Sequence, residues 1–253
     1  MIGIAGGNIS VVGNLNTNLG AVSLTAGSAS RANVSGAGIA LQNVTASSLA
    51  TTSSGYTRLN GNIVTGTSSA AGAQRYNSDL QVTNNVTLSS NGGSVTVVGN
   101  ISSPNTTSSL TVNAGAGQVT LGASGRTISG LSSLAVSSTN TINAIASTIS
   151  GNTALSFNGL KTGFLTLTAN NTYSGTTTLM DGTLQVGNGN AANNSRLGSG
   201  TIYIDGSTSL LSFYTGNTVV LNQSLIGNGA ISSSEDLQFN GACLLYTSPS
   251  PRD

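Results

Sequence analysis

Two segments of this chain repeat each other, and this repeat limits the possible folds more than any other feature. The stretch VTLSSNGGSVTV (86–97) matches LTVNAGAGQVTL (110–121) at an offset of 24 residues. The offset superimposes Val86 on Leu110, Leu88 on Val112, Gly93 on Gly117, Val95 on Val119 and Val97 on Leu121. Alternation of apolar and polar residues in both copies predicts strands with one buried face. A repeat of this length predicts one coil of a β-solenoid, whose equivalent positions stack about 4.8 Å apart.

Weaker copies occur near the start of the chain. ISVVGNL (9–15) resembles VTVVGNI (95–101), and GAVSLTAGS (20–28) resembles GQVTLGASG (117–125). Short strand-like runs bounded by Gly, Asn, Ser or Asp continue along much of the chain. Sustained helical periodicity is missing, and even SLAVSSTNTINAIASTI (133–149) is rich in β-branched residues, which predicts strands. Regular short strands also fit a β-sandwich, but a sandwich does not require the internal repeat.

The composition agrees with a core that is spread along one dimension. Gly, Ser, Thr and Asn make up 136 of the 253 residues, and only 5% of residues are charged. Apolar residues reach 37% without any Trp, so each short segment can bury a little surface against its neighbours. Seven Lys and Arg residues spread along the chain form no patch that would bind nucleic acid. No basic amphipathic helix and no apolar run of about 20 residues is present, so we expect no membrane insertion.

The two ends differ from the rest of the sequence. MIGIAGGNIS has no basic residue before its apolar residues, so we predict an internal start and no secretion signal there. The last segment, CLLYTSPSPRD (243–253), holds the only Cys and two of the three Pro residues. It resembles the translation of a sequencing adapter at the end of a truncated reading frame. We therefore expect 243–253 to be a non-native tail.

The stretch LKTGFLTLTANNTYSGTTTLMDGTLQVGN (160–188) resembles the autotransporter-associated β-strand repeat. Thr176 and Met180–Asp181 depart from that family's pattern. From the repeat, Asn171 and Tyr173 are the best candidates for residues at a coil corner, with Tyr173 covering adjacent apolar surface. The residues that carry the resemblance, and that we predict as a structural repeat motif, are Lys161, Gly163, Leu165, Leu167, Asn171, Thr172, Tyr173, Gly175, Gly182, Thr183 and Leu184.

The upstream stretch 56–101 is similar to the repeats of filamentous-haemagglutinin-type exoproteins, through the steps NGNI, QRYNSDLQV and GSVTVVGNI. We therefore predict three parts, 1–159 and 160–242 with the two kinds of repeat, and the tail 243–253. Both resemblances imply an all-β right-handed parallel β-helix with roughly 20–25 residues per coil. They also imply export by a Gram-negative bacterium, to the cell surface or medium, and tethering to a C-terminal outer-membrane barrel.

A search of the sequence for reactive groups finds little. The chain has no His, which excludes His-based nucleophile triads and His metal sites. Asp181 and Asp205 lie 24 residues apart and could stack, but each precedes a Gly, which favours a turn role. Glu235 and Asp236 are adjacent, so on a strand they point to opposite faces. GNGNAA (187–192) fits a dinucleotide-binding fingerprint but opens no predicted helix. We predict no catalytic, cofactor-binding or metal-binding residue.

Three functions from different classes remain open. The leading one is a secreted or surface-exposed adhesin, or adhesin stalk, that binds an unknown surface glycan or protein. The second is a self-associating component of an aggregate or biofilm matrix. The third is a β-helical polysaccharide-degrading enzyme whose carboxylates lie outside this fragment. The first leads because the repeats resemble structural passenger coils, which is an analogy between folds.

Overall fold

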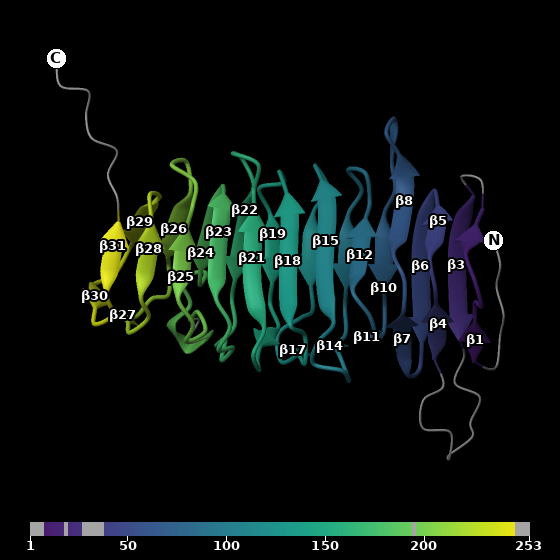
Figure 1. Ribbon diagram of the computed structural model, residues 1–253, viewed down its shortest axis with the longest axis horizontal. Helices are drawn as coiled ribbons and strands as arrows, with labels where there is room; N and C mark the ends of the chain where they lie inside the picture. Colours follow the sequence, from purple (N-terminus) through teal and green to yellow (C-terminus); the bar gives the residue numbers. More distant parts are fainter. Residues whose placement is uncertain (1–7, 18–19, 27–37, 194–195, 246–253) are drawn as a thin grey trace.

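The computed structural model describes residues 8–17, 20–26, 38–193 and 196–245. Their parallel strands stack as a β-solenoid of about nine turns along one axis, from the purple end to the yellow end of Figure 1. The predicted solenoid is therefore confirmed, and the sandwich is excluded. The stretch 133–149, predicted as strands, forms three of them.

Each regular coil contributes one strand to each of three faces, which we number in the order in which the chain visits them. The first face contains β1 (Ile9–Ser10), β4 (Ile39–Leu41), β7 (Tyr56–Leu59), β11 (Asp79–Val82), β14 (Ile101–Ser102), β17 (Thr127–Ser129) and β20 (Thr148–Ile149). The second contains β2 (Leu15–Asn16), β5 (Val44–Ala46), β8 (Ile63–Thr67), β12 (Val86–Ser89), β15 (Ser109–Gly115), β18 (Ser133–Ser138), β21 (Ala154–Asn158), β23 (Thr177–Asp181), β25 (Ile202–Ile204), β28 (Leu225–Gly227) and β31 (Cys243–Leu245).

The third face contains β3 (Ala21–Ala26), β6 (Ser48–Ser53), β10 (Gln74–Tyr76), β13 (Val95–Val97), β16 (Val119–Leu121), β19 (Asn143–Ile145), β22 (Phe164–Leu167), β24 (Thr183–Val186), β26 (Leu210–Phe213) and β29 (Ala230–Ser233). Three strands lie outside this scheme. The short β9 (Ala70–Ala71) pairs antiparallel with β8, and β27 (Val219–Leu221) with β30 (Leu237–Phe239) forms a separate sheet.

The register of the strands matches the internal repeat residue by residue. Val86 pairs with Leu110 and Leu88 with Val112 on the second face. Val95 pairs with Val119 and Val97 with Leu121 on the third face. Within the stretch 160–188, residues 165–168 and 183–187 lie on the third face in neighbouring coils. There β22 pairs in parallel with β24, and β23, which lies between them in the sequence, is on the second face.

One of the two weaker sequence matches does not reflect structural equivalence. The stretch that starts at Ile9 begins on the first face, whereas its match at Val95 begins on the third face. The two share only a strand, a Gly-Asn corner and a further strand, and such corners join more than one pair of faces. The other match holds, because β3 and β16 both lie on the third face.

Apolar side chains that point inward fill the bore of the solenoid. Leu110, Leu134 and Leu165 are examples with no exposed surface, and together the inward residues form one continuous cluster. Outward positions of the same strands carry mostly Thr, Ser and Asn. This alternation explains why single strands with few apolar residues suffice, since each coil buries its inward side chains against the two adjacent coils.

Side chains at the corners also join one coil to the next. Asn62 N donates to Asn43 Oδ1 at 2.8 Å, and Thr87 N donates to Asn62 Oδ1 at 2.8 Å. Asn100 N and Nδ2 donate to the two carboxylate oxygens of Asp79 at 2.8 and 3.1 Å. These bonds satisfy backbone donors where the chain leaves one face for another.

Glycines stack where corners of successive coils approach closely. A Cβ atom on Gly117 would lie 1.9 Å from the carbonyl oxygen of Gly93, and one on Gly93 would lie 2.4 Å from the carbonyl carbon of Gly72. The match of Gly93 with Gly117 in the sequence repeat therefore reflects a backbone contact that leaves no room for a side chain.

We predict that Gly117→Ala lowers the free energy of unfolding by about 3 kcal/mol, because the added methyl group overlaps backbone that cannot rotate away. Urea unfolding followed by circular dichroism measures this loss. Gly125→Ala is the matched control, because its Cβ meets nothing within 4 Å and the substitution carries only the strain of φ +79°. This strain costs about 1 kcal/mol. Equal losses in the two variants would contradict the close stacking of coils.

Candidate functional site

The first face is interrupted, and a groove lies beside this interruption. Its sheet ends at β20, and a new two-stranded sheet begins at β27. Between these points the chain passes the first face twice. In the described residues of these two segments (169–176, 187–193 and 196–201), the only pairing is an isolated parallel bridge between Asn170 and Arg196. The second segment contains the short 3-10 helix η1 (Ala191–Asn193).

The side chain of Asn171 replaces part of the missing ladder in the first of these segments. Asn171 Oδ1 accepts the N–H of Ile149 at 2.8 Å, and its Nδ2 donates to the carbonyl of Arg196 at 2.9 Å. One amide thus joins β20 on the preceding coil to the irregular segment on the following coil. Only 2% of Asn171 is exposed, so these bonds satisfy polar groups that water does not reach.

Tyr173 lies inside the bore with no exposed surface. Its hydroxyl shares a hydrogen bond of 2.7 Å with Thr177 Oγ1. Burial raises the pKa of Tyr173 to about 12, although this hydrogen bond opposes the rise. Gly198 on the next coil packs on the ring, since a Cβ there would lie 2.5 Å from Cδ2 of Tyr173. Tyr173 therefore fills the core of the interrupted coil and does not cover its outer surface.

The segment around Arg196 binds backward to the preceding coil. Arg196 N donates to the carbonyl of Ala169, Asn171 N donates to the carbonyl of Arg196, and Ser199 N donates to the carbonyl of Tyr173. Leu197 points into the core and is 4% exposed. Two side chains of the following coil reach back to this region. Gln223 Nε2 donates to the carbonyl of Gly198, and Asn217 Nδ2 donates to the carbonyl of Ala191.

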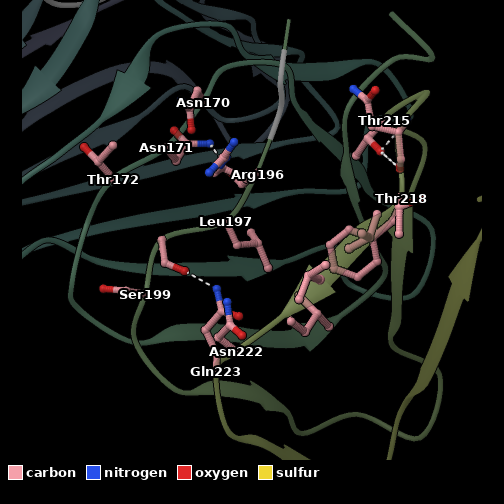
Figure 2. A pocket seen from close by; sticks show the side chains of 16 residues that line it. Asn170, Asn171, Thr172, Arg196, Leu197, Ser199, Thr215, Thr218, Asn222 and Gln223 are labelled. Atoms are coloured by element: carbon pink, nitrogen blue, oxygen red, sulfur yellow. Dashed lines mark hydrogen bonds between the residues drawn. The ribbon is translucent and has the colours of Figure 1, made fainter. Parts of the chain in front are cut away.

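A groove of about 650 Å³ lies between this segment and β27. In Figure 2, Asn170, Asn171 and Arg196 lie on one side, Thr215 and Thr218 on the other, and Asn222 and Gln223 at one end. Its volume falls within the range of about 300–1,000 Å³ that is usual for ligand pockets. Its lining consists of Asn170, Asn171, Thr172, Arg196, Leu197, Gly198, Ser199, Phe213, Thr215, Asn217, Thr218, Val219, Val220, Leu221, Asn222 and Gln223.

The lining combines hydrogen-bonding side chains with one charge. Arg196 is the only charged residue among the lining residues. Asn170 Oδ1 and Gln223 Oε1 are buried acceptors for which the described residues supply no hydrogen-bond donor. Because most lining residues carry hydrogen-bonding side chains and one carries a positive charge, the groove can bind a polar ligand that is neutral or negatively charged.

Only two residues of the predicted structural repeat motif line the groove. Asn171 and Thr172 line it, and Tyr173 lies beneath it. Lys161 and Gly163 belong to the turn before β22, which holds Leu165 and Leu167, while Gly175 precedes β23. Gly182 turns with φ +81° into Thr183 and Leu184 of β24. The motif thus builds one coil and its corners.

Sequence reasoning missed Arg196, Thr218, Val220 and Gln223. The sequence offers one indication, which is a missing pattern. NNSRLGSG (193–200) lacks the alternation of apolar and polar residues that first-face strands show in earlier coils. A gap in a repeated pattern shows that a strand is missing, but it does not show that the neighbouring coils leave a groove there.

Two acidic residues with lowered pKa lie in different places: Asp181 is the last residue of β23, and Glu235 follows β29. Asp181 Oδ1 accepts a hydrogen bond of 2.6 Å from Thr208 on the next coil, which lowers the pKa of Asp181, and it also accepts the N–H of Gly182. Ser234 is the main cause of the lowered pKa of Glu235, which also accepts the N–H of Gly216 at 3.1 Å. Across the described residues, no three His, Cys, Asp or Glu side chains gather in a way that could hold a metal ion.

Comparisons of the chain with protein families, with curated proteins and with solved structures found no match. In the part of the chain that the structure describes, no helix has the length and apolar character needed to cross a membrane.

We predict that Asn171→Ala lowers the free energy of unfolding by about 2 kcal/mol, because it leaves the buried N–H of Ile149 without an acceptor. Asn170→Ala is the matched control, since Asn170 Oδ1 has no donor to lose. Urea titration of both variants measures the difference. Equal stability of the two variants would show that the Asn171 amide does not join the coils.

Proposed function

We propose that this chain is part of a secreted or surface-exposed bacterial passenger protein, which acts as an adhesin or as the stalk of one. The observation that carries the proposal is the combination of a stacked rod with polar outer faces. A rod of parallel coils can hold a binding surface away from a cell, and each added coil extends it by about 4.8 Å. The resemblance of 160–188 to the autotransporter-associated repeat supports export by an autotransporter.

Columns of small polar side chains on the outer faces support this role. On the second face, Thr87 stacks on Thr111, Ala135, Ser156 and Thr178 through the strand register. Four of these five positions carry hydroxyl groups, and none carries a charge that would repel its neighbours. The binding energy for a surface ligand would then be spread over many weak polar contacts.

Surface display tests the proposal. Residues 1–242 are fused to an outer-membrane anchor on a non-adherent Gram-negative strain, and attachment to cultured epithelial cells is counted. We expect more attachment than with the anchor alone. A triple variant with Thr87, Thr111 and Thr178 replaced by Ala keeps the inward core, so a lower attachment at equal surface amount would assign binding to the second face.

Attachment no greater than that of the anchor alone, with the chain displayed in folded form, would contradict the adhesin role. Clumping of the displaying cells without attachment would favour self-association. Release of reducing sugars from polysaccharides by the purified chain would contradict a non-catalytic role.

A further inference from the structure

The backbone ladder between coils follows a simple rule in the regular part of the rod. Residues that point inward hydrogen-bond to the following coil, as when Leu80 N donates to the carbonyl of Asn100 at 2.7 Å. Residues that point outward hydrogen-bond to the preceding coil, as when Asn60 N donates to the carbonyl of Leu41 at 2.9 Å. Each strand on the first face therefore has a partner on both edges wherever coils follow one another regularly.

This rule fails at the groove. Leu197 points inward, so its N–H and carbonyl should bond to the following coil, at Thr218 and Val220. Neither of these backbone bonds forms among the described residues, and β27 has a partner strand only on its other edge, where it pairs with β30. Backbone donors and acceptors on both walls therefore face the groove without a strand between them.

We propose that the groove binds an extended peptide, which adds as a strand between the Leu197 segment and β27. An unpaired strand edge is a template for another strand, and peptide recognition by strand addition uses main-chain hydrogen bonds for affinity. Val220, with 44% of its surface exposed, lies at the middle of this edge. The added strand would restore the ladder that the two neighbouring coils leave open.

The lining favours a peptide that carries a carboxylate. Arg196 is the only charged residue of the lining, and guanidinium groups bind carboxylates through charge-assisted hydrogen bonds. The lining offers no exposed aromatic ring on which a sugar could stack, because its one aromatic residue, Phe213, is 2% exposed. A peptide therefore fits the groove better than a glycan does. Peptide binding in the groove is a property of the purified chain and does not depend on the proposed role in adhesion.

Fluorescence polarisation with the full chain tests this inference. The probe is a fluorescein-labelled peptide of sequence Thr-Val-Asp-Val-Thr, in which alternate residues can face the groove floor and the solvent. We expect saturable binding. A second probe with both valine nitrogens methylated cannot donate those two amide protons, and we expect it to bind about tenfold more weakly.

Two substitutions on the protein complete the test. Arg196→Gln should weaken binding of the first probe about threefold or more and reduce its dependence on salt. Arg75→Gln removes the same charge from an exposed outward position of β10 on the third face, so it should leave binding unchanged.

Several outcomes would overturn the inference. They are no saturable binding of the first probe, equal affinity for the methylated probe, or equal effects of the two Arg substitutions. Displacement of the first probe by a neutral oligosaccharide such as chitotriose would assign the groove to glycans. Displacement that accompanies dimer formation, detected by sedimentation, would assign it to a second copy of the chain.

Discussion

The structure depends on the parallel hydrogen-bond ladder that joins each coil to the next. A single coil buries too little apolar surface to be stable alone, because its strands carry only a few inward Leu, Val and Ile residues. The ladder holds these residues in columns, so that each side chain packs on its counterparts in the adjacent coils. Glycine stacks such as Gly93 on Gly117, and corner bonds such as Asn62 to Asn43, exist because the ladder brings corners this close.

The sequence predicted those parts of the fold in which one inward residue stacks on another of the same kind. Val86 and Leu110 could be aligned because both are apolar residues that point into the bore, and the register agrees. The match between 9–15 and 95–101 was wrong as a structural equivalence, because a Gly-Asn corner looks the same at more than one edge of the coil. Short motifs identify a corner, but they do not identify which faces it joins.

The groove could not be predicted in the same way, because it results from contacts that are missing. Asn171 lies in a recognisable motif, yet its position gives no sign that its amide replaces a strand and binds both Ile149 and Arg196. Nor does the sequence indicate that the segment after η1 bonds backward to Tyr173 and leaves the facing edge of β27 open. The candidate site therefore required the geometry of two coils together. The same interruption that weakens the ladder locally also gives a uniform rod one distinctive surface.

The most direct test of coil-on-coil stacking is a distance measurement along one outward column. Spin labels at Thr87→Cys and Thr178→Cys, with Cys243→Ser to remove the existing free thiol, are separated by four steps of the second-face register. Pulsed electron paramagnetic resonance should give a narrow distribution near 20 Å, from four spacings of about 4.8 Å. Moving the second label to Tyr203, which pairs with Thr178, should lengthen this distance by about one spacing. A broad distribution, or no lengthening with the second pair, would contradict a continuous stack of parallel coils.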